Sequence, residues 1–208
     1  SGFINEIGFD TYQKILNEAI EELKENEFKD LYHKDENIED KTFVKDTQID
    51  ADFELLFPDD YINNISERLN LYTQLNSVKT EEELLKYEAH LVDRFGELPT
   101  QAIDLLNSVR IKWIASKIGL EKVVMKQGKL IGYFIADQQS GFYQTQAFTR
   151  VLQYVQTHSH TCTMKEKKTR SGLRLLLTFE KITSVDRALK VLEPLKAPLP
   201  PKGELMAP

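Results

Sequence analysis

"LVDRFGELP", Leu91–Pro99, is the stretch that decides how the first half of this chain folds. Gly96 suits the backbone just past a last helical turn, because a residue without a Cβ accepts a positive φ. Leu98 is placed to pack back on that turn, and Pro99 is placed to open the next helix. Phe95, Gly96, Leu98 and Pro99 are therefore predicted to form a structural helix end.

Two adjacent charges, Asp93 and Arg94, occupy the same turn and are not explained by this pattern. An arginine is favourable beside the free carbonyls at a helix C-terminus, whereas an aspartate is mildly unfavourable there. Three interpretations remain open on physical grounds: exposed surface charge, a catalytic pair, or contact residues of an interface.

The residues on either side of this stretch predict three consecutive helices. Thr80 and Glu83 have the spacing of a capping box at the start of the helix that ends at Gly96. Apolar residues at helical spacing continue after Pro99, and a further helix is predicted after Asp59 and Asp60. A helical part over about 59–119 follows.

The remaining pattern is that of a small sheet with helices. "TQIDADFELLFP" alternates apolar and polar residues and predicts a strand over 47–57. Two apolar runs around Gln127-Gly128 predict a hairpin, and a helix, two strands around a basic turn and a short last helix follow. The predicted fold class is α+β: a helical subdomain followed by a small, mainly antiparallel sheet covered by helices. The sheet part covers about 120–196 plus strand 47–57, so the domain covers 47–196.

The two ends of the chain carry different patterns. Residues 1–25 contain an apolar stripe that predicts an N-terminal helix. Residues 26–46 are charge-dense and aperiodic, and predict a flexible charged loop. Residues 197–208 are rich in proline and predict a disordered tail.

Composition narrows the class of protein. The 208 residues carry a net charge of −6, with a strongly acidic first half and a basic second half, and 41% are apolar. The acidic half argues against a chain whose main task is holding nucleic acid. There is no apolar run of about 18 residues and no secretory signal, and one cysteine fits a reducing compartment. A cytoplasmic protein without a membrane contact is expected.

No motif for nucleotide or cofactor chemistry occurs. The chain has no G-x-x-x-x-G-K-[ST] loop and no G-x-G-x-x-G after a strand. "DRFG" differs from the kinase metal-binding triplet because Arg94 separates Asp93 from Phe-Gly, and the other kinase motifs are missing. We expect no cofactor and no catalytic residue in this chain.

Two groups have the residue types of a metal site. His158, His160 and Cys162 occupy alternate positions in the sequence, so a strand would place all three on one face. A second group alternates in the same way. That second group consists of Asp50, Asp52 and Glu54. No further ligand cluster accompanies either group, and half-exposed strands commonly carry such residues. We therefore predict no metal.

A basic segment, "KEKKTR", offers a weak phosphate contact. Its positive residues are Lys165, Lys167, Lys168 and Arg170. Each phosphate contact would be electrostatic and sensitive to salt. No aromatic residue is interleaved to stack on bases, so a solvated hairpin turn is the simpler interpretation.

Four segments carry a family resemblance. They are "IGFDTYQKILNEAIEELK", "IDADFELLFPDDYINNISERLNLYTQL" and "TEEELLKYEAHLVDRFGELP", followed by "LLNSVRIKWIASKIGL". Together they resemble the C-terminal domain of the bacterial transcription-repair coupling factors (Mfd), closely over residues 1 to about 125. The opening "SGFI" is similar to the end of the translocation element that follows the motor in that family.

The resemblance implies a parent protein that is an ATP-dependent translocase on double-stranded DNA. It displaces stalled RNA polymerase and recruits UvrA for nucleotide excision repair. In this family the C-terminal domain is a non-catalytic regulatory clamp. It docks within the same chain on the UvrB-like module and masks the surface that UvrA binds.

The resemblance also implies roles for particular residues. The docking face includes a helix ending in an E-L-x-D-R-F-G pattern, so Asp93 and Arg94 are the expected docking residues. His90 stands where the family has its glutamate, which removes one charge from that contact. Two rival functions remain. One is an accessory DNA-binding module that uses the basic C-terminal half. The other is a hydrolase that would depend on Asp50, Asp52 or the two histidines.

Overall fold

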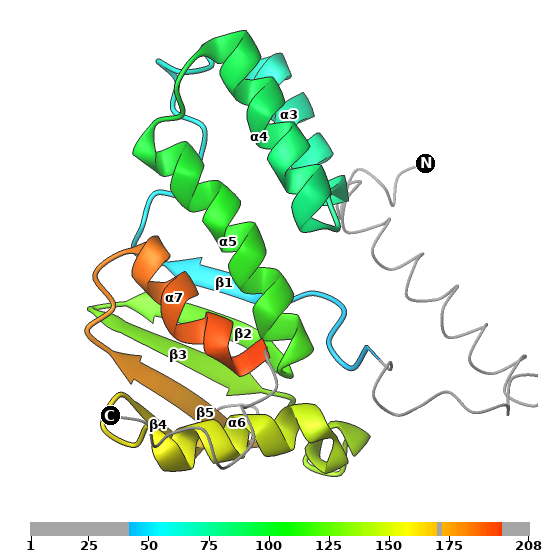
Figure 1. Ribbon diagram of the computed structural model, residues 1–208, viewed down its shortest axis with the longest axis vertical. Coiled ribbons are helices and arrows are strands. Elements are labelled where there is room, and N and C mark those ends of the chain that lie inside the picture. The colour runs from blue at the N-terminus through cyan, green and yellow to red at the C-terminus, as the bar shows by residue number, and fades with distance from the viewer. Residues whose placement is uncertain (1–41, 170–171, 197–208) are drawn as a thin grey trace, which may run out of the picture. The chain divides into compact units, whose positions relative to one another are not determined.

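The computed structural model describes residues 42–169 and 172–196 (Figure 1). The expected helix at 1–25, most of the loop at 26–46 and the tail at 197–208 lie outside the described residues. The helices are α3 (Ile65–Ser77), α4 (Glu81–Phe95), α5 (Thr100–Lys117), the short 3₁₀ helix η2 (Gly141–Gln144), α6 (Gln146–Thr157) and α7 (Val185–Lys196). The strands are β1 (Gln48–Ala51), β2 (Leu120–Lys126), β3 (Lys129–Phe134), β4 (Cys162–Thr169) and β5 (Gly172–Glu180).

The five strands form one sheet in the order β1-β2-β3-β5-β4. β1 pairs with β2 in parallel, and the other three pairings are antiparallel. The β2–β3 hairpin turns at Gln127 and Gly128, whose φ values of 52° and 72° are those of the two-residue turns that suit a twisted hairpin. The α+β fold with a mainly antiparallel sheet is confirmed.

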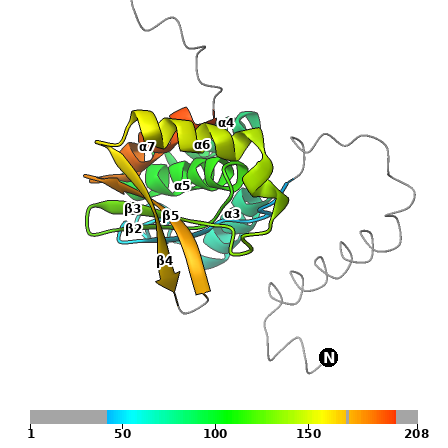
Figure 2. The same ribbon diagram turned by 90° about the horizontal axis from the view of Figure 1, so that it is seen from below.

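One face of the sheet carries the main core. Val123, Met125, Leu130, Phe134 and Leu177 point to this face, and each is fully buried. Side chains from α5, α6 and α7 pack against them, and Figure 2 shows these three helices on the same side of the strands. The alternate residues of the strands point to the other face, where no side chain joins this core.

A second, smaller core holds the helical region, which we define as residues 57–109. It gathers Leu71 and Leu75 from α3, Leu84 and Leu91 from α4, and Leu106 from α5. The C-terminal half of α5 contributes to the sheet core instead, through residues such as Ile111 and Ile114. The single helix α5 therefore belongs to both cores.

The strand expected over 47–57 is shorter in the structure. β1 ends at Ala51, and the last backbone contact with β2 is a hydrogen bond from the Asp52 amide to the Met125 carbonyl (3.0 Å). β2 itself ends one residue later at Lys126, where the hairpin turns. Residues 53–57 keep the apolar alternation but have no strand beside them to pair with.

The helix expected from Asp59 starts later. Pro58 accepts hydrogen bonds from the amides of Tyr61 and Ile62, which makes a single turn. α3 then begins at Ile65 with Asn64 as its cap, because the Asn64 side chain accepts a hydrogen bond from the Glu67 amide (3.0 Å). None of the described helices is both long and apolar enough to cross a bilayer.

Candidate functional site: the C-terminal end of α4

α4 begins at a side-chain cap that the sequence predicts. The Thr80 hydroxyl accepts a hydrogen bond from the Glu83 amide (3.2 Å). The Glu83 carboxylate reaches back to the Lys79 amide (2.7 Å), one residue before the partner expected in a capping box. Both bonds satisfy backbone donors that the first turn of a helix leaves free.

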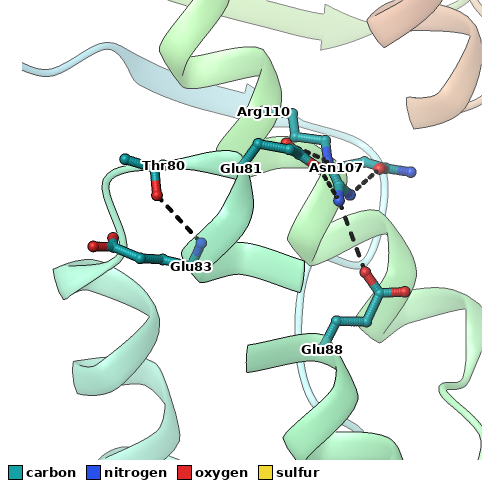
Figure 3. Close-up of polar contacts among 6 residues, drawn as sticks. All are labelled: Thr80, Glu81, Glu83, Glu88, Asn107 and Arg110. Atoms are coloured by element: carbon teal, nitrogen blue, oxygen red, sulfur yellow. Dashed lines mark hydrogen bonds and ion pairs between the residues drawn. The ribbon is translucent and has the colours of Figure 1, made fainter. Parts of the chain in front are cut away.

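The N-terminal half of α4 is tied to α5 by Arg110 (Figure 3). The Arg110 Nη2 lies 2.6 Å from Glu81 Oε1 and 3.7 Å from Glu88 Oε2, and its Nη1 donates to the Asn107 side chain (3.0 Å). The hydrogen bond to Glu81 raises the pKa of the Arg110 guanidinium, whose side chain is only 20% exposed. A bidentate, largely covered pair of this kind fixes geometry better than an exposed lysine pair does.

The other end of α4 is closed by Gly96 and Tyr61. Gly96 has φ 87° and ψ −163°, a region that residues with a Cβ avoid, and its amide bonds to the Val92 carbonyl (2.9 Å). The Tyr61 hydroxyl lies 3.3 Å from the Leu91 carbonyl and 3.1 Å from that of Gly96. Burial raises the pKa of this hydroxyl, so it stays a donor to the helix end. Its ring packs edge-on against Phe95 at 5.8 Å between centroids.

Arg94 is held by its neighbours within the domain. Its guanidinium forms an ion pair with Glu67 of α3 and lies over the Phe95 ring, 5.2 Å from the ring centroid. These contacts link the last turn of α4 to the first turn of α3. Arg94 therefore orients the end of the helix while remaining half exposed.

Asp93 and His90 are placed differently, because both are exposed on the outer side of α4. Neither makes a hydrogen bond or ion pair with another residue in the described ranges. Leu85 and Val92 lie on the same helix, 53% and 43% exposed. The outer side of α4 thus combines an unpaired carboxylate with exposed apolar surface.

The last two residues of the helix end connect α4 to α5. Leu98 packs against the smaller core, as the sequence predicts. Pro99 precedes the first turn of α5, and its carbonyl accepts hydrogen bonds from the amides of Ala102 and Ile103. It is the cap of that helix, one position before the first helical residue.

The three basic residues whose positions are described do not lie in a turn. β4 runs to Thr169 and is paired with β5 along its length, so Lys165, Lys167 and Lys168 are strand residues. Lys165 and Lys167 point to the face of the sheet that carries no helices, and Lys168 points to the opposite face. Arg170 lies outside the described residues.

The two candidate metal groups are not brought together. His158 ends α6, His160 lies in the following turn and Cys162 starts β4, so the shared strand face expected for them is wrong. Burial raises the pKa of the Cys162 thiol. Among the residues with described positions, no three His, Cys, Asp or Glu side chains lie close enough to hold an ion.

The three carboxylates of the second group bond to different partners. Asp50 pairs with Lys126 (2.6 Å), and that hydrogen bond lowers the pKa of Asp50. Asp52 accepts from the Gln127 amide (2.9 Å), and Glu54 accepts from the Gln101 side chain (3.2 Å). Each carboxylate has a structural partner.

Three residues that position the site are not marked by any local sequence pattern. Tyr61, Glu67 and Arg110 act through contacts with residues 22 to 35 positions away in the sequence. A single helix pattern cannot reveal such pairs. Only Arg110 could have been suspected from the sequence, because an arginine in the middle of a mainly apolar helix needs an acidic partner nearby.

Comparison with known proteins identifies the family of this domain. The fold is that of an α+β domain, and its candidate site is the exposed, charged C-terminal end of α4. Residues 51–145 match the model of the TRCF domain, so this part of the chain is a TRCF domain and the family resemblance seen in the sequence is confirmed.

Relatives with curated descriptions carry the same family name. The transcription-repair-coupling factor of Escherichia coli K12 is 35% identical over 123 residues, which cover 59% of this chain and 10% of that protein. The factor of Staphylococcus haemolyticus is 27% identical over 185 residues, 85% of this chain and 15% of that protein. The chain thus spans a small part of the length of these relatives.

A solved structure shares the fold. The crystal structure of a C-terminal domain of transcription-repair coupling factor matches with a TM-score of 0.53 at 19% identity. The match covers 74% of this chain and 94% of that one. At this identity the likeness supports the fold.

Proposed function

We propose that this chain is the non-catalytic C-terminal regulatory domain of a transcription-repair coupling factor. It docks through the end of α4 on the UvrB-like module of the same polypeptide and covers the surface that UvrA binds. The remainder of that polypeptide supplies the ATP-dependent movement on double-stranded DNA and the displacement of RNA polymerase. The chain needs no cofactor for this role.

The observation that carries the proposal is the unpaired carboxylate of Asp93 on a rigidly held helix. An exposed aspartate at a helix C-terminus is mildly unfavourable for the domain itself, because the free carbonyls there are also negative. Its neighbour Arg94 is already paired with Glu67. Asp93 therefore contributes nothing visible to the fold, and a partner outside the domain would give it a role.

The frame around Asp93 supports a docking role in a second way. Arg110 holds the start of α4, and Tyr61 and Gly96 hold its end, so the carboxylate needs little ordering when a partner binds. Val92 lies one residue away with 43% of its surface exposed. A charged contact beside apolar area is the composition of many transient interfaces.

His90 changes the expected strength of the contact. The family pattern has a glutamate at this position, so this chain presents one carboxylate where its relatives are expected to present two. The loss of one charge next to a basic partner surface should weaken docking modestly, since a charge at the rim of an interface mainly affects the association rate.

The proposal is tested by binding in trans. The whole chain is titrated against a separately expressed UvrB-like module of a coupling factor by calorimetry, as wild type and as Asp93→Lys. Charge reversal in a covered pair should weaken binding about 30-fold or more, by the roughly 2–5 kcal/mol expected for such a pair. Glu193→Lys makes the same charge change at an exposed position of α7 and should alter the affinity less than about twofold.

Failure of the wild-type chain to bind the module would contradict docking. Equal weakening by Asp93→Lys and Glu193→Lys would contradict the assignment of docking to α4, because the effect would then follow net charge.

A further inference from the structure

The face of the sheet opposite the helices carries a row of side chains that spans four strands. Strand pairing aligns Lys122 of β2 with Tyr133 of β3, Tyr133 with Leu176 of β5, and Leu176 with Lys165 of β4. Paired residues on adjacent strands point to the same face, about 4.8 Å apart. The row therefore places an aromatic ring and a leucine between two lysines. We call this the Lys122–Lys165 row.

The row faces away from the core. Tyr133, Ile131 and Val124 do not pack against the sheet core, although their neighbours along the strands do. Leu176 is also absent from that core, and its side chain is only 8% exposed, so Tyr133 and the two lysines form the accessible part of the row. Figure 2 shows α5, α6 and α7 together on the other side of the strands.

The charges on this face are unevenly paired. Lys126 is paired with Asp50, Lys129 with Glu180 and Arg174 with Glu121. Lys122, Lys165 and Lys167 make no ion pair with any residue whose position is described. The charge of Lys122 helps to lower the pKa of Asp50, but the hydrogen bond of Asp50 goes to Lys126. This face thus keeps a positive excess around an apolar centre.

The row also supplies the aromatic side chain that the basic segment lacks in sequence. Tyr133 is 32 residues before Lys165, yet pairing through β5 sets the two on one line across the sheet. The Tyr133 hydroxyl makes no hydrogen bond within the described part of the chain. A partly exposed ring beside unpaired lysines matches a surface on which bases stack while lysines contact phosphates.

We propose that the Lys122–Lys165 row is a contact surface for a single strand of nucleic acid. A base stacks on Tyr133, and the flanking phosphates lie against Lys122 and Lys165. Lys167, on the same face of β4, extends the positive surface toward the tip of the hairpin. A duplex cannot use the ring, because its bases are stacked on one another. This surface is on the sheet, whereas the docking end proposed above is on α4, so each can fail without the other.

The test uses the whole chain and a fluorescein-labelled 12-nucleotide oligothymidylate, with binding followed by anisotropy at low salt. Lys165→Glu is compared with Lys168→Glu, because both lysines are exposed on β4 and point to opposite faces. Lys165→Glu should weaken binding at least fivefold and lower the slope of log K against log salt by about 0.7. Lys168→Glu should change the affinity less than twofold.

A second pair of variants tests the ring. Tyr133→Phe keeps a stacking surface and should bind within twofold of wild type, whereas Tyr133→Leu should lose at least fivefold. A duplex of the same length should bind more weakly than the single strand, and poly-L-glutamate of matched charge should compete poorly.

Four results would overturn the proposal. They are no binding by the wild-type chain, equal loss in Lys165→Glu and Lys168→Glu, a duplex that binds as well as the single strand, and full competition by poly-L-glutamate. The last result would instead identify the row as a surface for an acidic protein.

Discussion

The helical region and the sheet region of this domain differ in the size of their apolar cores. Among the residues whose positions are described, the core of the sheet region contains 22 buried residues, and that of the helical region contains nine. The helical region also contains polar contacts between its elements. The Tyr87 hydroxyl donates a hydrogen bond to the Leu71 carbonyl (2.8 Å), and the Tyr72 hydroxyl accepts one from the Phe57 amide (2.8 Å). Arg110 adds its ion pair with Glu81. The proposed docking residue Asp93 therefore lies on the part with the smaller apolar core.

The two regions should therefore tolerate different amino-acid substitutions. The stabilisation from apolar burial is roughly proportional to the area buried. Substitutions that add or remove side-chain volume in the core reduce it most. Removing one partner of a hydrogen bond or ion pair lowers stability, and the loss is larger when the remaining polar group is buried.

The largest effect is expected from a pair of glycine substitutions. Gly119 and Gly96 both have positive φ, but a Cβ at Gly119 would lie 2.2 Å from the Phe142 ring, and one at Gly96 would meet no atom within 4 Å. Gly119→Ala should destabilise the fold by about 3 kcal/mol through strain and overpacking, and Gly96→Ala by about 1–2 kcal/mol through strain. Urea unfolding followed by circular dichroism measures both. Equal costs would mean that the sheet core can yield around Phe142.

A smaller effect is expected from the tie between α4 and α5. Arg110→Ala should cost about 1–2 kcal/mol, because Glu81, Glu88 and Asn107 each lose the largely covered guanidinium as a partner. The control is Lys86→Ala, which breaks the exposed pair with Glu82 and should cost about 0.5 kcal/mol or less. Hydrogen exchange gives the sharper measurement: amides of α4 should lose protection in Arg110→Ala, and amides of β3 should not. Uniform loss of protection would show that the two regions unfold only together.

The smallest effect concerns Asp104, on α5 where it meets α7. Burial and then the charge of Asp186 raise its pKa above the ordinary 3.8. A raised pKa means that the folded state holds the proton more tightly, so stability falls as pH rises from 3.8 through the raised value. Asp104→Asn should therefore raise the urea midpoint slightly at neutral pH, and the gain should vanish below pH 3.8. A gain that persists in acid would have another cause.

Short-range signals in the sequence were the reliable ones. The Thr80 cap, the turn at Gln127-Gly128 and the helix end at Gly96 each depend on residues within a few positions, and the structure contains all three. Such features are set by local backbone sterics and hydrogen bonding, which the sequence displays directly. The α+β class follows from them.

Features that depend on distant partners could not be predicted. The alternation over 47–57 was correct, but strand length depends on where β2 ends. The row that joins Lys122, Tyr133 and Lys165 depends on the register of three strand pairings. At the candidate site, exposure of Asp93 followed from helix spacing, whereas the engagement of Arg94 with Glu67 required the packing of α3 on α4.

The most direct test of the account measures UvrA capture by the complete coupling factor. A closed state favoured 99:1 lies only about 2.7 kcal/mol below the open one. A charge reversal that costs roughly 2–5 kcal/mol at a covered pair should therefore open a large fraction of molecules. Immobilised UvrA should capture the Asp93→Lys protein clearly more than wild type, while Glu193→Lys behaves as wild type. Equal capture of wild type and Asp93→Lys would contradict a masking role for the end of α4.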